Sequence, residues 1–150
     1  MVGKTMMRSK KSMVWFVLAT PIFLCGCFSD TPKVAKPQAR YTAIKNLDTA
    51  RLSVDIVPST FKGVLQINYD QTYKDSGDVQ GIVKGDTLIG DYSYKHYKLK
   101  LWKRKPIALL KKGDTLMMGE GIIKNTFGRI YFDQTVPISY SSSSFVFVKQ

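Results

Sequence analysis

The chain has 150 residues, of which 23 are Lys or Arg and 11 are Asp or Glu, so its net charge is +12. It holds one His and two Cys. With so few of these ligands, a zinc site built from His and Cys is effectively excluded. A Ser-His-Asp or Cys-His constellation would have to use the single histidine, His96.

Residues 1–26 have the pattern of a bacterial secretory signal peptide. Four basic and no acidic side chains come first, and an uncharged segment follows from Met13 to Cys25. This segment is shorter than the ~20 residues that a helix needs to span a bilayer core. A basic region followed by a short apolar region is typical of a secretory signal. The sequence therefore predicts a signal helix that is removed from the mature protein.

The apolar segment ends in Leu24-Cys25-Gly26-Cys27, which resembles the lipobox of bacterial lipoproteins. The resemblance implies a diacylglyceryl thioether on Cys27, cleavage before it, and acylation of its amino group. Cys25 is the weaker candidate, because it would place Leu24 where a small side chain is expected. The alternatives are an ordinary cleaved signal peptide and an uncleaved anchor. Two or three acyl chains anchor a protein stably, so the expected membrane contact is the lipid on Cys27.

Residues 27–46 are predicted as the lipidated cysteine followed by a flexible tether. Pro, Lys, Arg and Gln dominate this stretch, which shows no apolar period and cannot bury enough surface to fold alone. Removal of residues 1–26 takes away four basic residues, which leaves 19 basic and 11 acidic ones and a net charge of +8. The remainder, residues 47–150, is predicted to form one small domain without disulfides.

Alternation of apolar and polar residues with a period of two dominates the domain and predicts β-strands. Leu65, Ile67 and Tyr69, for example, alternate with polar neighbours. About eight strands are expected, at 50–57, 62–70, 79–84, 87–94, 98–103, 107–112, 115–123 and 127–133, with 144–149 as a closing strand.

Two turns repeat the same residues. The segment Lys84-Gly85-Asp86-Thr87-Leu88 is echoed by Lys112-Gly113-Asp114-Thr115-Leu116. Gly followed by Asp between two strands predicts a tight hairpin with positive φ at the glycine. The fold class is therefore all-β: an antiparallel meander that forms an up-and-down barrel or a strongly curved sheet, lipocalin-like in outline. Five glycines inside the expected strands favour curvature: Gly63, Gly81, Gly90, Gly119 and Gly121.

Three motifs together resemble small uncharacterised lipoproteins of Bacteroidetes-type bacteria. They are Gly85-Asp86-Thr87-Leu88 with Asp91-Tyr92, then Leu109 to Leu116, then Gly119-Glu120-Gly121. The resemblance covers most of residues 47–133 and implies a lipid-anchored β domain, but no activity. The chain departs from the family pattern at 95–105, which is basic and aromatic here. The expected location is the cell envelope, at the outer membrane facing the periplasm.

The basic stretch 95–112 is the first candidate site. It holds seven Lys and one Arg, interleaved with aromatic residues. An anionic lipid, an acidic glycan or an envelope protein is the expected kind of partner, and nucleic acid is not expected. The alternative is a solvated strand face in which Lys guards an edge. The candidate residues are Lys98, Lys100, Trp102, Lys103 and Arg104.

The expected barrel interior is the second candidate site. Glu120 falls on the face of Leu116 and Met118, which makes it a candidate polar group inside a closed barrel. Six aromatic residues share the presumed inner face, where they either line a ligand cavity or fill the core: Tyr69, Tyr92, Tyr94, Phe132, Phe145 and Phe147.

These features together favour a non-catalytic binding or accessory module anchored in the cell envelope. No cofactor and no metal are expected, because the sequence has no glycine-rich phosphate loop and no ligand set with metal-binding spacing. Two alternatives stay open: an enzyme of unrecognised type that uses carboxylates of the barrel, and a carrier of a small ligand in an interior cavity.

Overall fold

The computed structural model describes Gly3, residues 39–141 and residues 145–150. Cys27 and the expected signal peptide lie outside these residues. The described part consists of strands, turns and loops without a helix, so it contains no helix that is long and apolar enough to cross a membrane.

The described residues form ten strands. They are β1 (Ala39–Lys45), β2 (Asp48–Ile56), β3 (Thr60–Tyr69), β4 (Tyr73–Lys84), β5 (Thr87–His96), β6 (Trp102–Lys112), β7 (Thr115–Met118), β8 (Ile123–Thr126), β9 (Arg129–Phe132) and β10 (Val146–Lys149).

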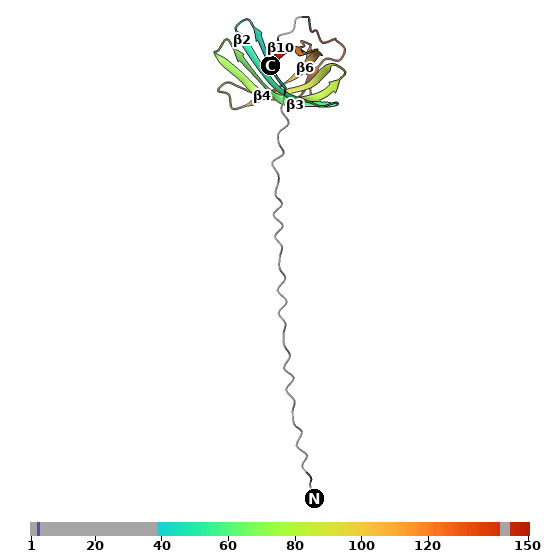
Figure 1. The fold of residues 1–150 in the computed structure, drawn as a ribbon. Coiled ribbons are helices and arrows are strands. Elements are labelled where there is room, and N and C mark those ends of the chain that lie inside the picture. Colours follow the sequence, from blue (N-terminus) through green and yellow to red (C-terminus); the bar gives the residue numbers. More distant parts are fainter. Residues whose placement is uncertain (1–2, 4–38, 142–144) are drawn as a thin grey trace. The chain divides into compact units, whose positions relative to one another are not determined.

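Eight of the strands close into an antiparallel barrel in the order β1-β10-β7-β6-β5-β4-β3-β2 (Figure 1). Strands β1 to β7 follow one another as an up-and-down meander, and β10 closes the barrel between β7 and β1. Strands β8 and β9 form a separate hairpin. The predicted all-β barrel is therefore confirmed, and so is the expected closing strand near the C-terminus.

The register defines two ends of the barrel. The end called here the terminal end carries Ala39 and the turns 57–59, 85–86 and 113–114. The opposite end, called the loop end, carries the turns 46–47 and 70–72 and the longer loop 97–101. The turns that repeat Gly-Asp are two-residue connections, and both Gly85 and Gly113 have a φ of 55°. The predicted positive φ is confirmed at both.

Alternate residues of the barrel strands point inward and form one core. Tyr92, Phe147 and Leu65 are among the largest side chains with almost no exposed surface. The hydroxyl of Tyr92 donates a hydrogen bond to the backbone oxygen of Leu65 at 3.1 Å, so the buried phenol has a partner. All residues of the core cluster lie between positions 41 and 147. The barrel therefore has a hydrophobic core of its own and forms one folding unit.

Strand β4 begins at Tyr73 and not at residue 79 as predicted, and three other boundary predictions are wrong. Residues 39–45 belong to β1 and not to the tether. The inward-facing Ala43 packs opposite Ala50. Because alanine contrasts little with polar neighbours in hydropathy, the period-two pattern of this strand is weak. Residues 98–103 and 107–112 are not separate strands, because β6 runs unbroken through Pro106 while Leu99 and Leu101 lie exposed before it.

The third error concerns residues after β7. This strand ends at Met118, far short of residue 123, and the chain then leaves the barrel to form the β8–β9 hairpin. Phe132 therefore lies in that hairpin and not on the inner face of the barrel.

Candidate functional site

The barrel wall is incomplete at the loop end. Strand β6 pairs with β7 only over residues 109–112, and β1 pairs with β10 only at Tyr41 and Thr42. Among the described residues, no strand lies between the 102–107 segment of β6 and the 43–45 segment of β1. The two short strands thus leave a lateral gap that opens toward the loop end.

Pro106 lies at the free edge of this gap. The oxygen of Ala108 accepts a hydrogen bond from the amide of Gly119 at 2.9 Å, so the polar groups of Ala108 face β7. Backbone groups of alternate residues face the same side of a strand, so the nitrogen of Pro106 also points toward the β7 side. No described strand pairs with β6 on that side at this position, so the missing N–H of proline costs no hydrogen bond between strands. Pro106 is therefore compatible with an unpaired strand edge.

A pocket of about 210 Å³ lies where the wall is interrupted. It is lined by Ile67, Met118 and Phe145 on its apolar side and by Lys45, Asn46, Asp48, Tyr69 and Lys105 on its polar side. Two ammonium groups, the Asp48 carboxylate and three apolar side chains thus converge on one small opening into the barrel. The Asp48 carboxylate accepts a hydrogen bond from the amide of Asp70.

Lys105 is the unusual member of this pocket. It faces the barrel interior, where its Nζ lies 5.6 Å from the ring centroids of both Tyr92 and Tyr94. The two rings are stacked 4.7 Å apart. Burial lowers the pKa of Lys105, although the more distant Asp75 carboxylate opposes this effect. No direct ion pair of Lys105 occurs within the described residues, so the Asp75 carboxylate offsets the cost of burying this cation only through longer-range attraction.

The carboxylate of Asp75 is already engaged nearby. Asp75 is buried on β4; its Oδ1 lies 2.6 Å from Nδ1 of His96 on β5, and its Oδ2 accepts a hydrogen bond from the Tyr69 hydroxyl at 3.2 Å. Burial and this carboxylate together raise the pKa of Tyr69. Both Asp75 oxygens thus have partners, and the carboxylate attracts Lys105 without forming a direct ion pair with it.

The sequence-based candidates fall into different places. Tyr92 and Tyr94 do lie inside the barrel. Their rings lie near the ammonium group of Lys105, which lines the pocket. The interior placement expected for Glu120 is wrong: its side chain is exposed, because β7 ends two residues earlier and Glu120 bridges Ser139 instead.

The basic candidates gather at the loop end, outside the pocket. The loop after β5 contains Lys98 and Lys100. Strand β6 begins with Trp102 and Lys103. Arg104 lies on the outer wall, where its guanidinium forms an ion pair with Asp91 on β5.

Sequence analysis did not single out Lys105, which lines the pocket, or the Asp75–His96 pair, which contacts the pocket residue Tyr69 through Asp75. A signal was available for two of them. Asp75 alternates with Gly77 and Val79, and Lys105 alternates with Ile107 and Leu109. Continuing the inward-facing period would have placed both charges inside the barrel.

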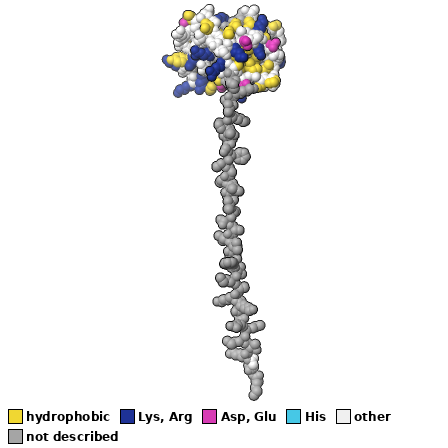
Figure 2. Space-filling view, in the orientation of Figure 1, with side chains coloured by type: hydrophobic (Ala, Val, Ile, Leu, Met, Phe, Trp, Pro, Cys, Tyr) yellow, Lys and Arg dark blue, Asp and Glu magenta, His cyan; other side chains and the backbone are white. Residues whose placement is uncertain are grey.

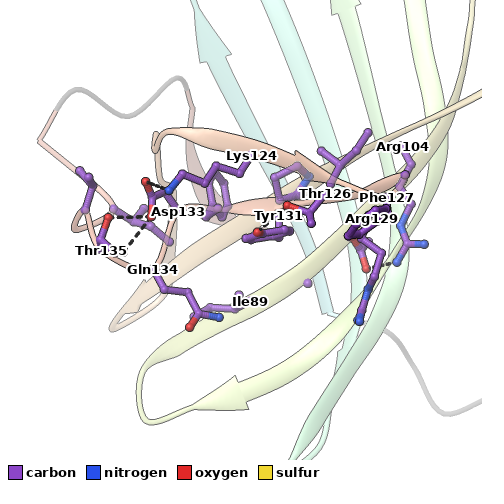
Figure 3. Close-up of a pocket in the computed structure, with 18 of the residues that line it drawn as sticks. Ile89, Arg104, Lys124, Thr126, Phe127, Arg129, Tyr131, Asp133, Gln134 and Thr135 are labelled. Carbon is purple, nitrogen blue, oxygen red and sulfur yellow. Dashed lines mark hydrogen bonds and ion pairs between the residues drawn. The ribbon is translucent and has the colours of Figure 1, made fainter.

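A second, wider cleft of about 1180 Å³ separates the β8–β9 hairpin from the outer wall of β5 and β6 (Figure 3). At one end Asp133 accepts hydrogen bonds from the amide and hydroxyl of Thr135 and pairs with Lys124 at 2.8 Å. These contacts, with that of Lys124 the largest, lower the pKa of Asp133 to about 2. At the other end Phe127 and Arg129 lie beside Arg104. The Lys124–Asp133 ion pair links β8 to the residue after β9, and Arg104 in the same cleft pairs with Asp91.

The described residues contain no group of three or more His, Cys, Asp or Glu that could hold a metal ion. No family model, no curated protein and no solved structure matches the chain.

Proposed function

We propose that this chain is a bacterial envelope lipoprotein, anchored at the outer membrane through Cys27, whose barrel binds a small organic acid. The ligand places its carboxylate on Lys105 and its apolar part against Ile67, Met118 and Phe145. The module is a carrier or sensor of this ligand and performs no chemistry on it.

One observation carries the binding proposal: Lys105 points into the barrel, has no ion-pair partner among the described residues, and lines a pocket with an apolar side. A ligand carboxylate would give Lys105 the direct ion pair that it lacks among the described residues, in a partly desolvated site. Hydrogen bonds to charged groups in such sites contribute about 1.5–3 kcal/mol. The size of the pocket restricts the ligand to a short acid.

Replacing Lys105 with Gln is expected to weaken binding of a short carboxylic acid by at least about tenfold, because the charge-assisted bond is lost. The measurement is calorimetric titration of residues 28–150 with hexanoate and with uncharged hexanamide. The unmodified protein should bind hexanoate and should bind hexanamide much more weakly.

Lys62→Gln is the matched control, since it removes the same charge from an exposed position on β3. It should bind hexanoate as the unmodified protein does, and thermal unfolding should show that both variants fold. Equal loss in the two variants, or equal affinity for acid and amide, would refute a specific role for Lys105.

Lipid attachment is tested separately. Mass spectrometry of the mature protein from its native membrane should find acyl chains on an N-terminal Cys27. We also expect Cys27→Ala to leave the membrane fraction. An unmodified N-terminus at another residue would disprove the anchor and leave the binding proposal to stand on its own test.

A further inference from the structure

The loop 97–101 and the start of β6 expose several large apolar side chains at the loop end. The exposed fraction is 49% for Tyr97, 48% for Leu99, 77% for Leu101 and 59% for Trp102. Single exposed apolar residues are common, but a contiguous group of them marks an interaction surface.

Basic residues surround this group. Lys95, Lys98, Lys100 and Lys103 lie within the same segment, and residues 95–105 contain no Asp or Glu. The Nζ of Lys95 lies 4.9 Å from the Trp102 ring centroid, and that of Lys98 lies 5.0 Å from the Tyr97 centroid. Figure 2 shows Lys and Arg side chains gathered on part of the visible face. The surface therefore combines apolar rings with a cationic rim.

The loop is held in a defined shape. The amide of Leu99 donates a hydrogen bond to the oxygen of His96 at 2.9 Å, and Lys98 adopts a positive φ of 62°. Such a conformation is uncommon for a residue other than glycine. The turn connects β5 to β6, and its apolar side chains point outward instead of packing back onto the barrel.

We infer that the segment 95–103 is a contact site for the surface of an anionic lipid bilayer. Trp and Tyr prefer the headgroup level of a membrane, and leucine side chains add apolar area that can enter the boundary. Lysines near an anionic membrane add electrostatic attraction, and their long stems allow the ammonium groups to stay in water. The unbroken positive charge of the segment favours this occupant over a protein surface of mixed charge.

The test uses Trp102 as its own reporter. Residues 28–150 contain Trp102 and no other tryptophan, because the second one is Trp15. Mixed with vesicles of equal parts phosphatidylglycerol and phosphatidylcholine, this protein should show a blue shift of Trp102 fluorescence. Vesicles of phosphatidylcholine alone should give a far weaker response.

Two double variants with the same charge change separate the site from general attraction. Lys98→Gln with Lys100→Gln should weaken partition into the anionic vesicles by roughly 25-fold, since each lysine near the surface contributes about fivefold. Lys111→Gln with Lys112→Gln, at the terminal end, should leave partition nearly unchanged. Equal weakening by both pairs, or no blue shift with anionic vesicles, would overturn the inference.

Discussion

Gly81→Val is expected to lower the free energy of unfolding by about 3 kcal/mol, because the new side chain cannot fit against the backbone of the adjacent strand. Gly81 on β4 lies directly opposite Gly90 on β5. A Cβ atom added at Gly81 would lie 2.5 Å from the Cα of Gly90, closer than such atoms approach in proteins. The two glycines allow the strands to bend together, and guanidinium unfolding of residues 28–150 measures the cost of blocking this.

Gln80→Val provides the control for Gly81→Val. It introduces the same side chain at the preceding position of β4, which points outward and is exposed. A β-branched residue suits an exposed strand position, so stability should change by no more than about 0.5 kcal/mol. Similar losses for the two variants would mean that close strand approach at Gly81 is not what the barrel requires.

Phe147→Ala should destabilise the barrel by about 4 kcal/mol, in the range of large-to-small substitutions in cores. Phe147 lies on β10 with no exposed surface, and its ring centroid is 6.0 Å from that of Phe145. Strand β10 is short yet joins β7 to β1, so loss of its main buried ring weakens the closure itself. Hydrogen exchange should accelerate first in β10 and at Tyr41 and Thr42.

Val148→Ala tests the same strand from its other face. Val148 is 50% exposed, so its truncation should cost no more than about 1 kcal/mol. If Val148→Ala destabilised the barrel as much as Phe147→Ala, the strand and not its buried ring would be the source of the stability.

The barrel was predictable because period-two alternation is strong where inner residues are large, as in Leu65, Ile67 and Tyr69. The two-residue turns were predictable because only a few residue pairs, Gly-Asp among them, suit such hairpins. Strand β1 was missed because its inner residues include alanines that carry little hydropathy contrast. Pro106 was misleading because a proline normally interrupts a strand, and only the lateral gap makes it acceptable.

The pocket was harder to predict than the barrel. Lys105 lines the pocket, and the Asp75–His96 pair reaches it only through Tyr69. These residues come from different strands, and the register of β4, β5 and β6 brings them to the same end of the barrel. Each is a charged or titratable residue in a stretch where polar side chains usually face water. The gap beside Lys105 depends on where β7 and β10 stop, and local sequence indicates strand ends poorly.

The proposed carboxylate site at Lys105 is the central claim, and methyl NMR of residues 28–150 during titration with hexanoate tests it most directly. The methyl signals of Ile67 and Met118, which line the pocket, should shift and saturate with hexanoate but not with hexanamide. The same signals should stay unchanged in Lys105→Gln. Unperturbed Ile67 and Met118 methyls, or shifts confined to Ile130 and Ile138 in the hairpin cleft, would contradict the account.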